Sequence, residues 1–278
     1  MYSAIDESRR LEVINDCYWP LLRLCEDSAL KIAIELPAHT LEIIEELDPE
    51  WVKCLKKLIS SGNIELIACG YTQMIAPLVP YDVNVQNLSI GQNVYNQILG
   101  IQPNIALINE QALSAGALDA FIDLQFQAVI MERNNVLVSQ DNLKMTEPDQ
   151  QNLLKSSTGQ IIPVIWNDSI NFQKFQRFAH GEITIKEYLA YIKNASNNLQ
   201  EDNIFVLYGN DVEIFDFRPG RYMTEALLKE KNEWNKIKQL YKSLKAYPNV
   251  LPSEILETNC SKNIVTLDSI RNPVRVKK

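Results

Sequence analysis

Short apolar runs alternate along the chain with longer stretches whose apolar residues recur at helical spacing. Six runs are short, apolar and without a helical period, which predicts buried strands: 31–36, 63–69, 104–108, 127–131, 161–165 and 204–208. Seven stretches repeat apolar residues three or four positions apart and predict helices: 11–24, 40–47, 49–60, 83–99, 115–124, 183–199 and 224–244. We expect Pro20 to kink the first helix, because proline has no N–H for the helical ladder.

This alternation of strand and helix is typical of α/β folds with a parallel sheet. A short stub at 1–5 brings the count to seven strands, so we predict a (β/α)7-type barrel of parallel strands over residues 1–223. Residues 137–159 predict a long polar excursion, and residues 224–278 predict a C-terminal extension, helical at first and irregular after Pro248. An open doubly wound sheet is the alternative, weakened because the chain has no G-x-G-x-x-G or Walker pattern.

Polar and charged residues gather directly after the predicted strands, at the ends where α/β barrels carry their chemistry. The densest cluster follows the run 204–208 and holds three carboxylates, Asp211 and Glu213 among them, with the guanidiniums of Arg218 and Arg221. Such crowded charges are either paired on the surface or exposed to a cleft, where carboxyl pKa values shift. We interpret the cluster as an active-site loop; a solvated loop with surface ion pairs is the alternative.

The composition narrows the classes of function. The 278 residues carry a net charge of -8, which argues against a nucleic-acid partner because phosphate binding requires a basic face. The five cysteines are odd in number and form no C-x-x-C pair, so we expect small core residues in a reducing compartment. No apolar run reaches transmembrane length and the N-terminus lacks a signal-peptide core, so we expect a cytoplasmic protein with no membrane partner.

Two acidic residues stand at strand ends that would face one cleft in a barrel. Glu110 follows the run 104–108, and Asp211 follows the run 204–208. A pair of facing carboxyl groups is the minimum equipment for glycoside hydrolysis, with one as nucleophile and the other as acid and then base. For Glu110 the alternative is a carboxylate at a helix N-terminus, where the helix dipole favours it.

Four segments, in this order, resemble motifs of glycoside hydrolase family 57: 17–22 (CYWPLL), 62–78 (GNIEL to GYTQMIAPL), 105–112 (IALINEQA) and 211–215 (DVEIF). The third segment is similar to the nucleophile motif, a strand that ends in a glutamate. The fourth is similar to the acid/base motif Asp-x-Glu-[Leu/Ile]-Phe, whose first Asp donates the proton. The resemblance runs from about residue 11 to 225. It implies Glu110 as nucleophile and Asp211 as proton donor.

The same resemblance implies a seven-stranded (β/α) barrel with a helical C-terminal region, in agreement with the strand count. It implies action on α-linked glucans, as in amylases, 4-α-glucanotransferases or branching enzymes, or on α-galactosides. Two positions depart from the family pattern. The family opens with a His-bearing strand of which residues 1–5 keep only the tail, so we expect the first motif to be largely missing. Gln73 stands where the family often has His or Glu. Both changes remove polar contacts from the sugar subsite, so an inactive relative is an alternative.

Six further residues are expected to contact substrate: Tyr71, Gln73, Trp166, Asp168, Glu213 and Arg218. Trp166 and Asp168 follow a strand, so the indole could stack on a sugar while the carboxylate binds a hydroxyl. The alternative is a core tryptophan followed by a helix cap. Arg218 could orient a neighbouring carboxylate or bind an anionic sugar, and a simple ion-pair role is its alternative.

The two histidines, His39 and His180, lie far apart in sequence and accompany no cysteine cluster, so we expect neither a metal site nor a cofactor. His180, beside Gly181 at a helix break, is expected to be structural. We therefore expect a metal-independent retaining glycoside hydrolase or glycosyl-transferring enzyme acting on an oligo- or polysaccharide. The alternatives are a catalytically inactive carbohydrate-binding relative, a metal-dependent polysaccharide deacetylase-like barrel and an acidic scaffold protein. The sugar, the linkage, hydrolysis versus transfer, and the oligomeric state stay open.

Overall fold

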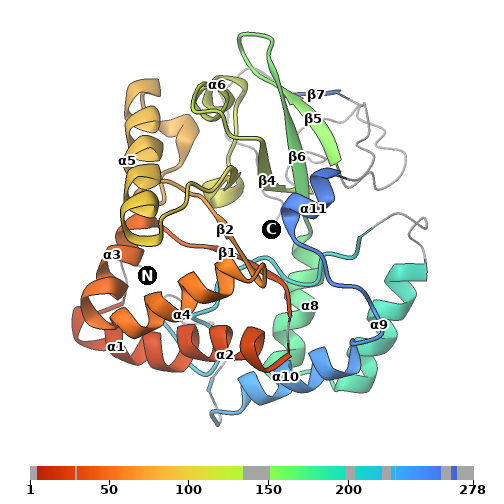
Figure 1. The fold of residues 1–278 in the computed structure, drawn as a ribbon. Coiled ribbons are helices and arrows are strands. Elements are labelled where there is room, and N and C mark those ends of the chain that lie inside the picture. Colours follow the sequence, from red (N-terminus) through yellow and green to blue (C-terminus); the bar gives the residue numbers. More distant parts are fainter. Residues whose placement is uncertain are drawn as a thin grey trace. The chain divides into compact units, whose positions relative to one another are not determined.

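The computed structural model of the chain describes residues 5–28, 30–133, 151–197, 204–220, 227–228, 230–257 and 264–267. Figure 1 shows its helices and strands. The chain forms two compact units whose segments alternate along the sequence. Unit 1 comprises Met1–Ile32, Ile44–Ile64 and Ile170–Val250, and unit 2 comprises Ala33–Ile43, Glu65–Ser169 and Leu251–Lys278. Neither unit has a boundary at residues 223–224, where the sequence predicted the start of a C-terminal extension.

The strands, most of whose residues belong to unit 2, are β1 (Ile32–Glu35), β2 (Ile64–Ile67), β3 (Ile105–Leu107), β4 (Ala128–Glu132), β5 (Gln151–Lys155), β6 (Ile161–Asn167) and β7 (Ile264–Thr266). β1 pairs with β2, and a second sheet has the order β3-β4-β6-β5-β7. A parallel bridge between Ala68 and Ala106 links the end of β2 to β3. β3, β4 and β6 run parallel, whereas β5 runs antiparallel to β6 and parallel to β7.

The central strands form because their side chains are apolar on both faces, as expected of parallel strands covered by helices. Ile105 pairs with Ala128, and Val129 pairs with Val164. All four side chains are at most 1% exposed. Because these strands are parallel and in register, the carboxyl ends of β3, β4 and β6 meet at one edge of the sheet. That edge carries the turn Asn109–Gln111 directly after β3.

The helices of unit 2 are η3 (Ala76–Leu78), α5 (Tyr81–Leu99), η4 (Asn109–Gln111), α6 (Ala115–Asp123) and α11 (Pro252–Glu257), and α3 (Ala38–Leu47) begins in unit 2 and ends in unit 1. α5 ends at Gly100, whose left-handed φ of 74° is the usual helix C-cap conformation. α6 begins after Ser114, whose hydroxyl accepts from the N–H of Ala117 at 3.1 Å. The predicted helices 83–99 and 115–124 agree with α5 and α6 to within two residues at each end.

The helices of unit 1 are η1 (Glu7–Arg9), α1 (Arg10–Val13), η2 (Ile14–Tyr18), α2 (Trp19–Ser28), α4 (Pro49–Ser60), α8 (Ser169–Ala179), α9 (Ile185–Asn197) and α10 (Glu233–Ser243). η2 is a π-helical turn directly before Pro20. The proline ring collides with the carbonyl four residues earlier, and a π-helical turn relieves such a collision. The carbonyl of Asp16 loses its helical donor at Pro20 and accepts from the indole N–H of Trp234 at 2.8 Å. The structure thus has a π-helical turn before Pro20, and the kink expected there stays a prediction.

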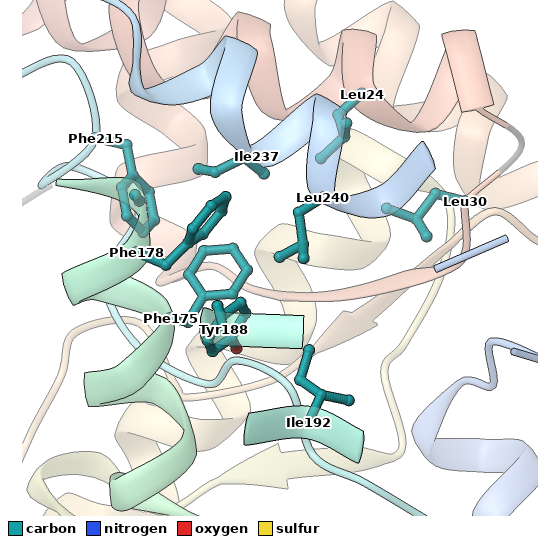
Figure 2. Packing of buried hydrophobic residues seen from close by; sticks show 10 residues of the cluster. Leu24, Leu30, Phe175, Phe178, Tyr188, Ile192, Phe215, Ile237 and Leu240 are labelled. Atoms are coloured by element: carbon teal, nitrogen blue, oxygen red, sulfur yellow. The ribbon is translucent and has the colours of Figure 1, made fainter. Parts of the chain in front are cut away.

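An aromatic cluster forms the core of unit 1. Phe175 and Phe178 on α8, Tyr188 on α9 and Phe215 point toward one another, with Leu240 of α10 beside them (Figure 2). The rings of Phe178 and Tyr188 stack with centroids 5.2 Å apart, and Phe175 meets Phe215 edge-on at 5.8 Å. Ring pairs of this kind contribute about 0.5–1.5 kcal/mol each beyond the burial of their area. The cluster therefore joins three helices to the charged loop that contains Phe215.

The predicted strand 204–208 is wrong. Residues 204–209 are half-buried and have no strand structure. Phe205, Leu207 and Tyr208 pack against the aromatic cluster, with the Tyr208 ring 4.7 Å from that of Phe175. The apolar character of this run thus comes from packing against helices, not from pairing in a sheet. The predicted stub at 1–5 lies outside the described residues except for Ile5, which is not in a strand.

Four further elements differ from the sequence-based prediction. β5 lies inside the stretch 137–159 predicted as a polar excursion, of which residues 137–150 lie outside the described residues. It forms because β6 gives it an antiparallel partner, and its Asn152 is buried against Trp166. α11 and β7 occupy the region predicted to be irregular, and α10 begins at Glu233, nine residues after the predicted start at 224.

A buried ion pair joins α10 to the end of α8. Glu233, the first residue of α10, is 4% exposed. Its Oε1 accepts from Nη2 of Arg218 at 2.7 Å and lies 2.7 Å from Nδ1 of His180, and its Oε2 accepts from the N–H of Asp216 at 2.6 Å. The Asp216 carboxylate in turn accepts from the N–H groups of Glu233 and Trp234 and so caps α10. The structural role expected for His180 is confirmed.

We expect Glu233→Gln to lower the free energy of unfolding by about 3 kcal/mol near neutral pH, because it removes the charge that Arg218 faces in buried surroundings. Burial raises the pKa of Glu233, but hydrogen bonds from His180 and Arg218 outweigh it and lower the pKa from 4.5 to about 2. Since the folded pKa lies below the unfolded one, this contribution is present above about pH 5 and is lost as the pH falls toward 2. Urea unfolding at a series of pH values measures both effects.

The control is Glu182→Gln, which breaks a pair with Arg177 whose side chains are 47% and 49% exposed. We expect it to change the free energy of unfolding by less than about 1 kcal/mol. Equal losses in the two variants, or a Glu233→Gln protein with the pH dependence of the wild type, would contradict the buried ion pair.

Candidate active site

Glu110 stands in the tight turn η4, directly after β3, with its side chain exposed. Its backbone is left-handed, with φ 52° and ψ 17°, and Gln111 follows with φ 55°. Outside glycine this conformation costs roughly 1–2 kcal/mol per residue, because Cβ approaches the following carbonyl oxygen. Two such residues in succession persist only where the surroundings fix them, and such strain is concentrated at functional sites.

Amide side chains on both sides of Glu110 tie the turn to neighbouring strands. Nδ2 of Asn109 donates to the carbonyl of Cys69, just after β2, at 3.0 Å. Oε1 of Gln111 accepts from the backbone N–H of Glu132, the last residue of β4, at 2.6 Å. The turn is thereby held between the ends of β2 and β4. The exposed carboxylate extends from a backbone that has little freedom to move.

Two of the predicted substrate residues, Tyr71 and Gln73, follow β2 at the same edge. The Tyr71 hydroxyl donates to Oε2 of Glu42 at 2.9 Å and lies 3.3 Å from Nδ1 of His39. The hydrogen bond to Glu42 raises the pKa of Tyr71, so the phenol stays protonated. Nε2 of Gln73 donates to Oε1 of Glu35 at 3.3 Å. Both side chains are thus oriented by residues at or after the end of β1 and keep part of their surface open to solvent.

In unit 1, Asp211 and Glu213 lie on the charged loop. The Tyr208 hydroxyl donates to the carbonyl of Asp211 at 2.6 Å, and Asp211 itself is half-buried. Glu213 is 8% exposed, and its Oε1 accepts from the hydroxyl of Tyr18 at 2.6 Å. The π-helical turn η2 therefore positions Tyr18 to hold this loop. Glu110 lies in unit 2 and Asp211 in unit 1.

Two other predicted substrate residues are engaged inside the protein. Arg218 donates to both oxygens of Glu233 and to the carbonyl of Phe217, which is the ion-pair role named as its alternative. Trp166 is 5% exposed, and its indole N–H donates to Oδ1 of Asn152 at 2.6 Å. Its ring is covered by the core, which favours the core alternative over a sugar-stacking platform. Sequence alone does not separate a core tryptophan from an exposed one at a strand end.

Asp168 is half-buried and directly precedes α8, and its N–H donates to Oδ1 of Asn167 at 2.9 Å. Its position agrees with both the helix-cap and the sugar-binding alternatives, so its role stays a prediction. Arg221, the second guanidinium of the charged loop, lies outside the described residues.

The cysteines Cys17, Cys25 and Cys69 are buried free thiols. Burial raises the pKa of each thiol, that of Cys25 to about 12. Protonated thiols are poor nucleophiles, so the core role expected for these three is confirmed. Within the described parts of the chain, no three His, Cys, Asp or Glu side chains form a group that could hold a metal ion. In the same parts, no helix has the length and apolar character needed to cross a membrane.

Glycosyl hydrolase family 57 matches residues 2–268 of the sequence. The chain belongs to this family. Among curated proteins, an α-amylase of Pyrococcus furiosus is 24% identical over 80 residues, which are 28% of this chain and 12% of the amylase. The family match over residues 2–268 confirms the resemblance that the motifs 62–78, 105–112 and 211–215 indicated.

Solved structures show the same fold. A 4-alpha-glucanotransferase of Thermococcus litoralis superposes with a TM-score of 0.78 and 17% identity, over 96% of this chain and 40% of that one. The alpha-amylase AmyC of Thermotoga maritima superposes with a TM-score of 0.70 and 11% identity, over 96% and 73% of the two chains. These family 57 structures have a (β/α)7 barrel, and the predicted fold class is confirmed. The family 57 chain covers less than half the length of the glucanotransferase, and its 80-residue matched segment covers about an eighth of the P. furiosus amylase.

Sequence reasoning identified Glu110 in this family 57 chain but missed the residues that position it. Asn109 and Gln111 both carry carboxamides. A carboxamide in a turn can bond to a neighbouring strand or face solvent, and the residue type does not tell which. Tyr18 likewise stood in a quoted segment without an assigned partner. The one available signal was three consecutive polar residues with carboxamides on both sides of a glutamate, directly after an apolar strand.

We expect Glu110→Gly to be more stable than Glu110→Ala by about 1 kcal/mol, because only glycine enters the left-handed region without a Cβ collision. Urea unfolding of the two variants measures the difference. The matched control is Glu45, an exposed residue of the regular helix α3, where alanine should instead be the more stable of the pair by about 1 kcal/mol. If alanine were the more stable variant at position 110 as well as at position 45, the turn would not be left-handed in solution.

Proposed function

We propose that this family 57 chain carries a retaining glycoside hydrolase or glycosyl-transferring centre for α-linked glucans, with Glu110 as nucleophile and Asp211 as acid/base. The observation that carries the proposal is the exposed Glu110, held left-handed at the carboxyl end of β3 by Asn109 and Gln111. Backbone strain kept at an exposed carboxylate is expected of a group placed for chemistry. Similarity to an α-amylase and a 4-alpha-glucanotransferase supports the substrate class.

In the first step, a carboxylate oxygen of Glu110 attacks the anomeric carbon and forms an ester bond. The bond from that carbon to the leaving oxygen breaks, and the protonated carboxyl of Asp211 gives its proton to this oxygen. A retaining mechanism requires the two carboxyl groups to be about 5–5.5 Å apart. The tethers at Asn109 and Gln111 would hold the backbone that carries one of the two groups.

In the second step, Asp211 takes a proton from a water molecule or from a sugar hydroxyl. The oxygen thus activated attacks the anomeric carbon, and the ester bond to Glu110 breaks, which regenerates both carboxyl groups. Water gives hydrolysis and a sugar hydroxyl gives transfer. Tyr18 contributes by holding Glu213, two residues from Asp211, so that the acid/base keeps its orientation.

Tyr71 and Gln73 are proposed to bind sugar hydroxyls beside Glu110. Tyr71 donates its own proton to Glu42, so its oxygen is ready to accept one from a sugar. Gln73 is exposed and can donate and accept. We also propose a cytoplasmic location, supported by the buried free thiols of Cys17, Cys25 and Cys69, which suit a reducing compartment.

Glu110→Gln should lower kcat on maltooligosaccharides by at least about 1,000-fold, since an amide cannot form the ester intermediate. Asp211→Asn should lower kcat by about 100- to 10,000-fold on natural glucans. The loss in Asp211→Asn should be much smaller with an aryl maltoside, whose phenolate leaves without a proton. Chromatography of products and release of the phenol measure the two rates.

The control is Glu46→Gln, which removes an exposed carboxylate from α3 and should keep the wild-type rates. Wild-type turnover that survives in Glu110→Gln would refute Glu110 as the nucleophile. Absence of products from a folded wild-type protein, with maltooligosaccharides still bound, would favour the inactive carbohydrate-binding relative.

A further inference from the structure

A second candidate binding site lies at the opposite ends of β3 and β4 from Glu110. A cavity of about 290 Å³ opens there, where the segments 102–104 and 124–126 precede the two strands. The N–H of Gln127 donates to the carbonyl of Asn104 at 2.7 Å and joins these segments. Every residue that lines the cavity belongs to unit 2. Six of them matter here: Gln92, Asn93, Gln102, Asn104, Gln125 and Phe126.

The chemistry of the lining selects a neutral ligand rich in hydroxyl groups. Five of these six residues carry a carboxamide, and no charged side chain lines the cavity among the described residues. A carboxamide offers both a donor and an acceptor, which matches hydroxyl groups that also do both. Phosphates and carboxylates are instead held by cationic side chains. Phe126 is 6% exposed and its ring packs on Phe121, so the wall offers the ligand mainly carboxamides.

Gln92 is fixed in a way that leaves an acceptor to be satisfied. Its Nε2 donates to the carbonyl of Pro103 at 2.7 Å, which orients the carboxamide at the cavity wall. Its Oε1 is buried and accepts no hydrogen bond from any residue that the structure describes. A buried acceptor without a donor is unfavourable, and the carboxamide has to turn toward the cavity before a ligand hydroxyl can pair with it.

Gln125 gives an independent sign that a side chain is needed at this place. It follows α6 with a left-handed φ of 61°, and the N–H groups of Gln125 and Phe126 donate to Ile122 and Phe121, which closes the helix end. Glycine is the usual residue at such a position, because it has no Cβ to collide. In this chain the position is occupied by Gln125, a carboxamide-bearing residue that lines the cavity.

We propose that this cavity binds a short stretch of a neutral glycan, and so forms a second glycan contact on unit 2, away from Glu110. Its volume lies at the small end of ligand pockets, about 300 Å³, which fits one or two sugar rings better than a longer chain. The choice of an α-glucan as ligand rests on the proposed function; the neutral, hydroxyl-rich class rests on the cavity alone.

The test uses the full chain with Glu110→Gln, so that the probe, maltotriose, is not consumed. Side-chain NH₂ resonances of Asn93, Asn104 and Gln125 are followed by NMR during the titration. We expect all three to shift along one saturating curve. Gln125→Gly and Asn93→Ala should each weaken this binding by about tenfold, since each removes a hydrogen-bonding carboxamide. Glycine suits the left-handed backbone at 125 and alanine suits the helix at 93, so both variants should fold at least as well as the parent.

Gln97→Ala is the matched control, because Gln97 is an exposed amide of the same helix α5 that does not line the cavity. It should leave the curve unchanged. Maltotriose that shifts only resonances near Glu110 and Tyr71, or equal affinity in all three variants, would overturn the second site. Shifts at Asn93 and Gln125 in a protein whose wild type cleaves no glycan would support the cavity while the proposed catalytic function fails. The two failures are thus distinguishable.

Discussion

Two carboxamide side chains, Asn109 as a donor and Gln111 as an acceptor, hold the turn that carries the exposed carboxylate after β3. Glu110 and Gln111 would leave the left-handed region without these two hydrogen bonds, because neither residue type favours it. Their partners are backbone groups at Cys69 and Glu132, at the ends of β2 and β4. The tethers therefore depend on the parallel register of three strands, and that register depends on the burial of their apolar side chains. Packing in the sheet thus determines where the proposed nucleophile lies.

In unit 1 the loop that carries Asp211 is held by helices. Residues 204–220, the described part of the chain around its charged loop, contain no strand, and residues of neighbouring helices hold the loop. Tyr18 holds Glu213, and Asp216 exchanges hydrogen bonds with the first residues of α10. The aromatic cluster around Phe215 closes the loop from within. Each proposed catalytic carboxylate thus sits on irregular backbone that side chains lock, a placement that lets a loop be as fixed as a strand.

The sequence predicted correctly those features of the fold that depend only on which residues are buried. The run 104–108 is apolar because both faces of its strand are covered, so its prediction as a strand is confirmed. The run 204–208 is as apolar but packs on aromatic rings, since composition reports burial and not the hydrogen-bond partner. Asn152 looked solvated and is buried, because Trp166 supplies its partner from another strand. The family motif indicated Glu110 as the candidate nucleophile. The left-handed backbone of Glu110 could not be predicted, because groups distant in sequence impose it.

The interleaved order of the segments has a consequence for synthesis on the ribosome. β5 pairs with β7 through Leu153 and Ile264, so roughly 110 residues must be added before the outer side of β5 meets its partner. At typical elongation rates this takes on the order of ten seconds. During that interval the nascent chain offers an open strand edge to any other chain nearby. The late synthesis of β7 therefore determines how long this edge of β5 stays open to pairing with another chain.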